Sequence, residues 1–235
     1  MLAKIKTKKL VAKGTLLVEF DLLGQTVNFQ PGQFFFITLQ AMPYTDERGN
    51  RRHFTIVNSP TKNDILSFTT RLRESAFKKT IKELPNGSEV EVGPIKGNFI
   101  LPAKTIFPLV FVAGGIGITP YLSMLRFIKD KKLPYDITLL YSNPDEESAA
   151  YLEELKSLEK EIPRFRLVLT MTKQDSWQGE KRRIDGEFVK KYLSDYRHRQ
   201  FFIAGPPAMV EGTKKELLHL GIGEEKIKTE NFTGY

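Results

Sequence analysis

The hydrophobic pattern of this chain changes near its middle, and this change limits the possible folds more than any other feature. Up to about residue 102, apolar residues fall in short runs rich in aromatic and β-branched side chains, separated by turn signals. From residue 106 onward, apolar runs of strand length alternate with segments of helical periodicity. The pattern predicts two domains of different architecture, over residues 1–102 and 106–235.

The first segment predicts a small antiparallel β-domain. Strand-like runs occur at residues 16–20, 33–39, 54–57, 66–70 and 89–92. Residues 75–84 are the one stretch in this segment with a helical pattern. Short strands at this spacing are typical of a closed sheet, so we expect an antiparallel six-stranded barrel.

The second segment predicts a parallel sheet. Residues 108–113 form a continuous apolar run, as a strand buried on both faces would. Further strands are predicted at residues 137–141, 165–170, 200–204 and 226–230, and helices from residue 119 and over residues 146–160, 186–193 and 208–220. Such alternation indicates an α/β domain with helices on both faces of its sheet.

The composition excludes several kinds of site. The chain has no cysteine, which excludes disulfides, thiolate zinc sites and cysteine-ligated iron–sulfur clusters. Its three histidines, His53, His198 and His219, share no ligand spacing, so we expect no metal site. No apolar run is long enough to cross a bilayer, and the first residues lack the core of a signal peptide. We therefore expect a cytoplasmic protein without membrane insertion.

Positive charge is concentrated in the first half of the chain. The net charge is +8, and residues 1–105 hold 16 lysines and arginines against 9 acidic residues. Such a surplus suits a nucleic acid or an acidic protein partner, and a solvated basic face explains it equally well. The chain lacks base-stacking repeats and a recognition-helix signature, so we expect no nucleic acid.

A glycine-rich turn joins the buried strand at residues 108–113 to the helix that follows. Gly114, Gly115 and Gly117 allow tight turning and close approach of a ligand to the backbone. Thr119 can cap the helix, and Pro120 suits its first position. Free amides at a helix start attract phosphate, so the turn favours a nucleotide site over a purely structural role.

A second candidate site lies in the strand around residue 54. On a strand, Arg52 and Phe54 share one face and Thr55 points to the other. Arginine can bind a pyrophosphate and phenylalanine can cover a flat ring. Taken alone, however, these residues suit an ordinary barrel strand at least as well.

The order of the motifs along the chain is more specific than any one of them. The series resembles the ferredoxin–NADP+ reductase family over nearly the whole chain. It consists of Arg52-x-Phe54-Thr55, Gly93-Pro94-x-x-Gly97-x-Phe99, Gly114-Gly115-x-Gly117-x-Thr119-Pro120, Ala204-Gly205-Pro206-Pro207-x-Met209-Val210 and Glu230-x-Phe232. The chain is similar to a stand-alone bacterial reductase module of that family, without a fused ferredoxin or haem domain.

The resemblance implies a flavin site in the first domain. Arg52 would hold the flavin phosphates, and Thr55 would hydrogen-bond near flavin N5. Phe54 stands where the family has tyrosine, so it can pack on the flavin but lacks the hydroxyl. Ser75 begins the helix at which the family places the flavin pyrophosphate. The remaining flavin-binding positions would be His53, Ile56 and Val57.

The resemblance also implies a nicotinamide nucleotide site in the second domain. The turn from Gly114 to Pro120 would receive the nucleotide, with Thr119 near the nicotinamide. Gly205 and Pro206 would add to this site after the strand at residues 200–204. Many relatives have cysteine where this chain has Ala204, so no thiol can assist the reaction here.

The end of the chain matches the family's Glu-x-aromatic pattern. Glu230 would lie by the reacting centre together with Thr55. Phe232 would stack on the flavin and be displaced by nicotinamide, and Tyr235 is a weaker candidate for that stacking role. Docking of the tail in an apolar groove is the structural alternative for both aromatic residues.

These implications together predict a flavin-dependent oxidoreductase. It would transfer hydride from NADPH or NADH to FAD and pass electrons to a partner such as ferredoxin, flavodoxin or an oxygenase component. FAD rather than FMN is implied by the family pattern, and the basic first half predicts an acidic electron-transfer protein as partner. The alternative is an electron-transfer subunit of a larger complex that has no turnover alone.

The choice of coenzyme depends on residues after the second and third strands of the α/β domain. After the second strand, Asp145 and Glu146 would repel the 2′-phosphate of NADPH or bind ribose hydroxyls. After the third strand, Lys173, Arg182 and Arg183 could bind that phosphate or be solvated loop charges. Because three cations are available to bind the 2′-phosphate and only two acids would repel it, the sequence slightly favours NADPH.

Overall fold

The computed structural model describes residues 1–233, and they form two compact units. The first unit comprises residues 1–101 and 119–130, and the second comprises residues 102–118 and the chain from residue 131. The helix expected from residue 119 is thus grouped with the first unit by its contacts. The domain boundaries drawn from the sequence stay a prediction, and each unit is described by itself.

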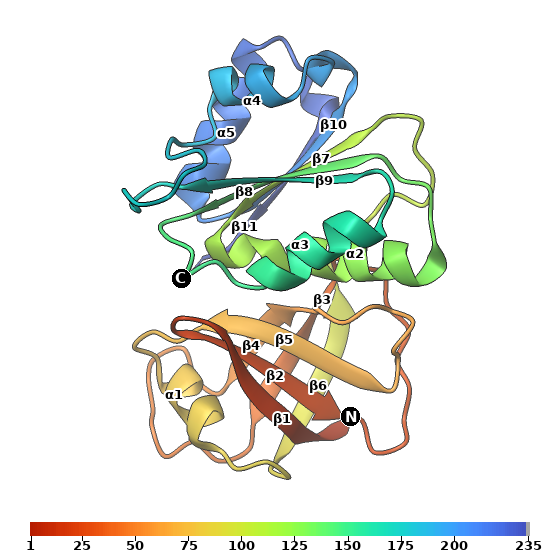
Figure 1. The fold of residues 1–235 in the computed structure, drawn as a ribbon. Coiled ribbons are helices and arrows are strands. Elements are labelled where there is room, and N and C mark those ends of the chain that lie inside the picture. The colour runs from red at the N-terminus through yellow and green to blue at the C-terminus, as the bar shows by residue number, and fades with distance from the viewer. Residues whose placement is uncertain (234–235) are drawn as a thin grey trace. The chain divides into compact units, whose positions relative to one another are not determined.

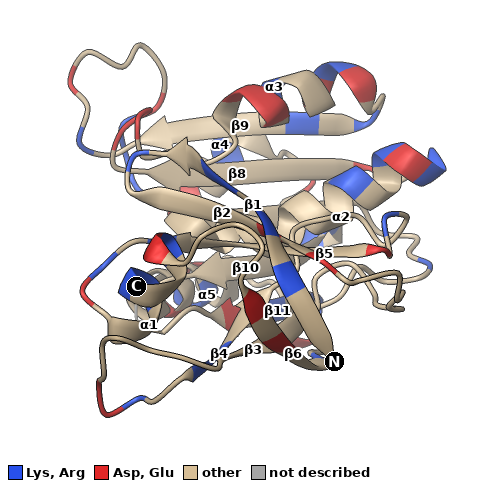
Figure 2. Cartoon of the chain, turned by 90° about the horizontal axis from the view of Figure 1, so that it is seen from below, with Lys and Arg blue, Asp and Glu red and all other residues tan. Residues whose placement is uncertain are grey.

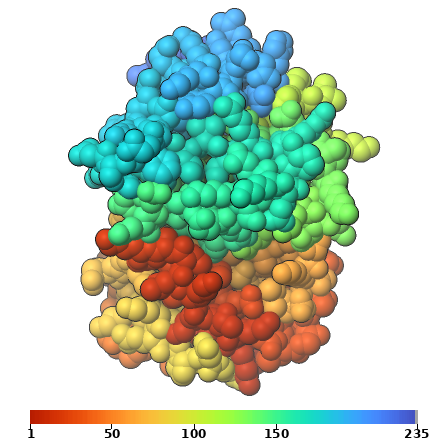
Figure 3. Space-filling model, viewed as in Figure 1, coloured from red at the N-terminus to blue at the C-terminus, as the bar shows by residue number. Residues whose placement is uncertain are grey.

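The first unit is built on a six-stranded antiparallel sheet with the strand order β4-β3-β6-β1-β2-β5 (Figure 1). A tight turn with Gly14 at a φ of 61° joins β1 to β2, and their hairpin lies at the surface of this unit (Figure 3). The elements of this sheet and its helix are β1 (Leu2–Ala12), β2 (Thr15–Asp21), β3 (Phe34–Leu39), β4 (Arg51–Thr55), β5 (Ile65–Arg71), α1 (Ala76–Glu83) and β6 (Glu89–Lys96).

The sheet curls towards a barrel but its end strands are joined only locally. An isolated antiparallel bridge connects Ile56, directly after β4, to Phe68 on β5. Beside it, the amide of Val57 donates to the carbonyl of Ser67 at 2.9 Å. The predicted six-stranded antiparallel sheet is confirmed, and it is barrel-like without a closed ladder in the part of the chain that the structure describes.

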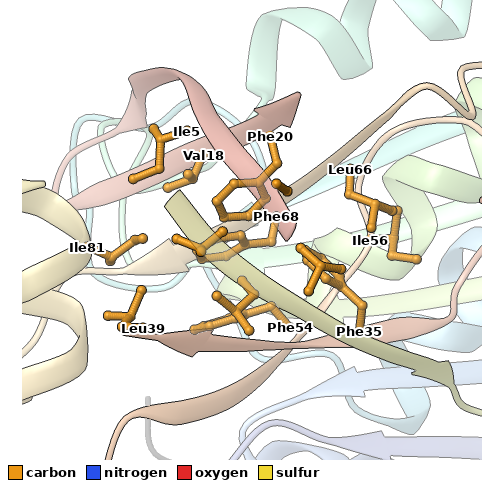
Figure 4. Packing of buried hydrophobic residues seen from close by; sticks show 14 of the residues in the cluster. Ile5, Val18, Phe20, Phe35, Leu39, Phe54, Ile56, Leu66, Phe68 and Ile81 are labelled. Carbon is orange, nitrogen blue, oxygen red and sulfur yellow. The ribbon is translucent and has the colours of Figure 1, made fainter. Parts of the chain in front are cut away.

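Aromatic rings fill the interior of the first unit. Along β3 the buried residues alternate with partly exposed ones, as the pleat of a half-buried strand requires. Phe20, Phe35 and Phe68 are fully buried, and Phe54 packs onto Phe68 with 4.1 Å between ring centroids (Figure 4). The hydrophobic run at residues 33–39 therefore places every second side chain in the core.

The second unit is built on a parallel sheet with the strand order β11-β10-β7-β8-β9 (Figure 1). Its members are β7 (Leu109–Gly114), β8 (Ile137–Asn143), β9 (Phe165–Met171), β10 (Gln200–Gly205) and β11 (Ile227–Asn231). The chain moves outward from β7 to β8 and β9, then returns to the other side of β7 with β10. The strand order therefore reverses between β7 and β10, and in such sheets ligands bind at the carboxyl ends of these strands.

Helices accompany the parallel sheet, as the alternation of the sequence predicted. They are α3 (Leu152–Glu161), α4 (Gly186–Tyr192) and α5 (Pro207–His219), while α2 (Ile118–Lys131) connects β7 to β8. Phe188 of α4 and Leu217 of α5 are fully buried in a core with Val110, Val112 and Ile203 from the sheet. One face of the sheet is thus covered by α4 and α5.

The helix predicted from residue 146 begins later, at Leu152. The side chain of Asp145 accepts the amide of Ser148 at 2.8 Å, which makes a turn where the helix was expected. Tyr151 follows with a left-handed φ of 62°, which a helix interior does not allow. The local hydrogen bond of Asp145 therefore shortens the predicted helix.

Candidate functional site

Arg52 lies on β4 and its guanidinium is enclosed by the preceding loop. Its Nη1 donates to the carbonyls of Arg48 at 2.6 Å, Gly49 at 3.0 Å and Arg51 at 2.8 Å. Its Nη2 lies 3.2 Å from Oδ1 of Asp46. Both terminal nitrogens of Arg52 are therefore already engaged, and the loop at residues 46–49 supplies every one of these partners except the carbonyl of Arg51.

The same carboxylate of Asp46 lies at the start of α1. Its Oδ2 accepts the amide of Ala76, the first residue of the helix, at 2.9 Å. Ser75 is the N-cap of α1, as its position at the start of the predicted helix suggested, and its hydroxyl accepts the amide of Lys78 at 3.4 Å. Arg52, Asp46 and the start of α1 therefore meet at one place.

A buried lysine adds positive charge to this place. The Lys78 side chain belongs to a residue that is only 8% exposed. Burial, and then the charges of Arg73, Arg48 and Arg52, lower the pKa of Lys78 from 10.5 to about 8. Four cations thus surround the start of a helix whose first amides also attract negative charge. The arrangement suits a group with several negative charges, such as a pyrophosphate.

The other motif residues of β4 point in alternating directions. His53 pairs with Phe36 and is exposed on the outer face, whereas Phe54 pairs with Phe35 and is 4% exposed. Thr55 at the end of the strand is 6% exposed. Phe54 is packed on Phe68, so the side of its ring that faces Phe68 is not open to a flavin. Its role in covering a flavin ring stays a prediction.

The segment after β4 is fixed by a buried asparagine. The amide nitrogen of Asn58 donates to the carbonyls of Lys62 at 2.9 Å and Ile65 at 3.2 Å. Its oxygen accepts both the amide of Ser67 at 2.9 Å and the hydroxyl of Ser67 at 3.1 Å. Ile56 and Val57, which the resemblance assigns to flavin contacts, lie directly before this anchor and are fully buried.

Helix α2 holds the same segment through its side chains. Ser123 donates to the carbonyl of Asn58 at 2.8 Å, and Arg126 donates to the carbonyl of Val57 at 2.7 Å. Thr119 and Pro120, at the start of this helix, are buried. The helix that follows the glycine turn is therefore bonded to the segment that follows the flavin motif.

In the second unit, the glycine turn fits closely against β10. A Cβ added to Gly117 would lie 2.1 Å from the carbonyl oxygen of Ala204, so no side chain is possible there without movement of the backbone. A Cβ on Gly205 would lie 3.2 Å from Cα of Gly114. Gly115 has a left-handed φ of 52° in a short 3-10 turn. These glycines therefore bring the carboxyl ends of β7 and β10 together without side chains between them.

Pro206 and Phe232 complete this edge of the sheet. Pro206 is the N-cap residue of α5 and directly follows Gly205. The amide of Phe232 donates to the carbonyl of Gly205 at 2.9 Å, and Phe232 is 9% exposed. Tyr235, the weaker stacking candidate, lies outside the described residues.

Glu230 is a buried acid at the same level of the sheet. It pairs with Ala204 of β10, which in turn pairs with Ala113 of β7. Burial raises the pKa of Glu230 from 4.5 to about 7. Its Oε2 is buried and finds no hydrogen-bond partner among residues 1–233. A carboxyl with one buried and unpartnered oxygen, at the carboxyl ends of parallel strands, is a functional candidate.

Two of the residues expected to contact the coenzyme ribose already have side-chain partners elsewhere in the chain. Arg182 makes two hydrogen bonds to Asp185, at 2.8 and 2.7 Å, and is thereby neutralised. Glu146 receives Nε2 of Gln174 at 2.9 Å, which holds this acid after β8. Lys173 and Arg183 are exposed. One of the three cations that favoured NADPH therefore already has a carboxylate partner.

The structure thus gathers the predicted residues into two sets. The first unit brings Arg52 and Ser75 to one place, and the second brings the glycine turn, Gly205, Pro206, Glu230 and Phe232 to the ends of β7, β10 and β11. Sequence reasoning missed the side chains that act across the chain, because their partners lie far away in sequence. These are Asp46, Asn58, Lys78, Ser123 and Arg126.

Residues 1–233 contain no group of three acidic or histidine side chains that could hold a metal ion. None of the helices found in those residues is both long and apolar enough to cross a bilayer.

Known proteins resemble this chain in sequence. Residues 111–215 match the family described as the oxidoreductase NAD-binding domain. An NADPH oxidoreductase of Mycobacterium tuberculosis is 27% identical over 214 residues, covering 89% of this chain and 53% of that protein. A glycine betaine monooxygenase reductase subunit of Chromohalobacter salexigens is 28% identical over 211 residues, covering 87% of this chain and 56% of the subunit. The chain spans about half the length of these curated relatives.

Solved structures share the complete fold. The flavohaem-like FAD/NAD-binding domain of a nitric oxide dioxygenase from Vibrio cholerae superposes with a TM-score of 0.85, at 16% identity and 98% coverage of both chains. A ferredoxin NADP+ reductase from Neisseria gonorrhoeae with bound FAD and NADP superposes with a TM-score of 0.80, at 21% identity and 98% coverage of both.

The chain thus combines a barrel-like antiparallel sheet with a parallel sheet that lies largely within the match to the oxidoreductase NAD-binding domain. The fold of the chain is similar to that of the solved ferredoxin NADP+ reductase, and residues 111–215 resemble the oxidoreductase NAD-binding domain.

Proposed function

We propose that this protein is an NAD(P)H-dependent flavoprotein reductase that binds FAD and passes electrons to a protein partner. The observation that carries the proposal is the pair of ligand-ready places described above. The start of α1, with Arg52 and Lys78, is suited to a pyrophosphate, and the side-chain-free turn at Gly114–Gly117 is suited to a dinucleotide.

The residues of the first unit would bind and orient FAD. Arg52, the amide of Ala76 and Lys78 would hold its two phosphates, and Ser75 would keep the first turn of α1 in shape. Thr55 would donate a hydrogen bond near the ring, from a segment that Asn58 keeps in place. A dinucleotide with two phosphates uses this charge more fully than a flavin with one, which supports FAD over FMN.

The residues of the second unit would bind and orient the nicotinamide nucleotide. Gly114, Gly115 and Gly117 would allow the diphosphate to approach the backbone, and Gly205 and Pro206 would form the other side of this edge. Oε2 of Glu230, which has no hydrogen-bond partner within residues 1–233, would hydrogen-bond a polar group beside the reacting centre. Phe232 would cover the flavin until nicotinamide replaces it.

Hydride chemistry explains the inventory of side chains. When bound, FAD accepts a hydride from the nicotinamide and can release electrons singly. The protein needs no strong base, nucleophile or metal for this, and its work is to hold the two rings in register and exclude water. A chain without cysteine or clustered histidine is consistent with that task.

The partner is proposed from the relatives and from charge. Relatives of this chain are reductase components of oxygenases, such as a terephthalate 1,2-dioxygenase reductase of Comamonas that is 24% identical over 237 residues. The basic first half supports an acidic electron-transfer protein as the acceptor. The cytoplasmic location expected from the sequence stays a prediction.

A second candidate function follows from the length of the relatives. Because the chain spans about half of them, it could be an electron-transfer subunit that works only inside a larger complex. Turnover of the purified chain with an added acceptor supports the reductase, whereas flavin binding without turnover supports the subunit.

The flavin site is tested by two neighbouring arginines. Arg52→Ala should weaken the free energy of FAD binding by about 1.5–3 kcal/mol, because a hydrogen bond to a charged group contributes about that much. Arg51→Ala is the matched control, because Arg51 is exposed and lies over the ring of Phe36 on the outer face. FAD titration by flavin fluorescence measures both. Equal affinities in the two variants would remove Arg52 from the site.

A further inference from the structure

The loop before β4 makes hydrogen bonds with Arg52 and with the amide of Ala76, which we assign to the flavin phosphates. Its carbonyls at Arg48 and Gly49 receive Nη1 of Arg52, and its carboxylate at Asp46 receives Nη2. The loop therefore engages both terminal nitrogens of the arginine.

The carboxylate of Asp46 has the environment of a bound phosphate oxygen. One of its oxygens accepts the first amide of α1 at 2.9 Å. The other accepts the amide of Arg48 at 3.0 Å and lies 3.2 Å from Arg52. A helix-start amide, a loop amide and a guanidinium are the donors that commonly bind phosphate in proteins.

Charge explains why an internal anion stabilises this place. Arg48, Arg52 and Arg73 each interact with Lys78 there and oppose its positive charge. Burial acts to raise the pKa of Asp46, but the amides of Ala76 and Arg48 and the charge of Arg52 hold that pKa below its ordinary value. Asp46 is therefore ionised at neutral pH and offsets part of the repulsion among the cations.

We propose that Asp46 is an internal substitute for a flavin phosphate, which occupies the phosphate site when flavin is absent and must be displaced when flavin binds. This inference rests on the proposed function. The carboxylate and the phosphate compete for Arg52 and the amide of Ala76, so Asp46 weakens flavin binding and keeps the bound flavin exchangeable. Asp46 is in this sense an affinity-determining residue of the flavin site.

The test compares flavin affinities of the flavin-free full chain and two variants. Asp46→Asn keeps an oxygen that can accept the amide of Ala76 but removes the competing charge. Glu47→Gln is the matched control, since Glu47 is exposed one residue away and its loss changes the net charge equally. Fluorescence titrations use FAD, FMN and riboflavin as probes.

We expect Asp46→Asn to bind FAD about tenfold more tightly than Glu47→Gln, because a charge-assisted contact no longer competes. Riboflavin, which has no phosphate, should bind both variants equally. An FAD affinity that is unchanged or lower in Asp46→Asn would overturn the proposal, and so would an equal gain for riboflavin. Asp46→Ser, checked for folding by circular dichroism, replaces Asp46→Asn if the latter does not fold.

Failure of this inference can be told apart from failure of the proposed function. If wild type and Asp46→Asn both bind FAD with equal affinity, the flavin site stands and only the competition is wrong. If neither binds FAD at any concentration, both the proposed function and the inference are wrong.

Discussion

Burial of the Glu230 side chain disfavours the charged form of its carboxyl group. Its pKa rises from 4.5 to about 7, so the neutral form is favoured in the folded protein over much of the acidic range. Such a group contributes most to stability below pH 4.5, and this contribution is lost as the pH rises through about 7. A shift of this size corresponds to about 3 kcal/mol.

We therefore expect Glu230→Gln to raise the free energy of unfolding at about pH 8 by up to ~3 kcal/mol and to change it little at pH 4.5. Urea unfolding at the two pH values measures this. Glu225→Gln, at an exposed site nearby, should have no effect at either pH. An equal effect of Glu230→Gln at both pH values would show that its burial does not control ionisation.

At the residue scale, motifs with a local cause could be predicted and contacts across the chain could not. Gly117 was expected because a turn between strand and helix needs it, and the contact with Ala204 gives the physical reason. Asp46 gave no signal, because its partners Arg52 and Ala76 become neighbours only after the sheet has formed. Sequence spacing carries no information of that kind.

At the scale of elements, periodicity gave the strands and most helices. Ser75 caps α1 as its position suggested, and β7 is buried on both faces as its apolar run predicted. The helix predicted from residue 146 was too long, because Asp145 forms a local turn that periodicity does not show. Incomplete closure of the barrel-like sheet also left no trace in the sequence.

The loops after β8 and β9 lead to a prediction on the coenzyme. Since Asp185 holds Arg182 and Gln174 holds Glu146 in place, we expect kcat/KM to be higher with NADH than with NADPH. Arg182→Ala should leave the ratio of kcat/KM for the two coenzymes unchanged, because its charge is already paired with Asp185. Arg183→Ala, at an exposed site, should lower activity with NADPH alone. A selective loss of NADPH activity in Arg182→Ala would show that Arg182 leaves Asp185 to bind the 2′-phosphate.

At the scale of the whole molecule, the charge distribution predicts a salt-dependent partner reaction. Basic residues occur along β1 and near α1 (Figure 2), and residues 1–105 have seven more basic than acidic residues. Electron transfer to an acidic protein should slow steeply as the Debye length falls from ~10 Å at 0.1 M to ~3 Å at 1 M salt. Transfer to an uncharged one-electron acceptor is the control. Equal salt dependence of the two reactions would exclude charge-guided docking.

A flavoprotein reductase of the proposed kind holds FAD that a nicotinamide nucleotide can reduce. The most direct test is an anaerobic titration of the FAD-loaded protein with NADH and with NADPH, followed by the absorbance of oxidised flavin. We predict complete bleaching by about one equivalent of the preferred coenzyme, and return of the colour when an acceptor is added. Bound FAD that keeps its absorbance with an excess of both coenzymes would contradict the proposed reductase.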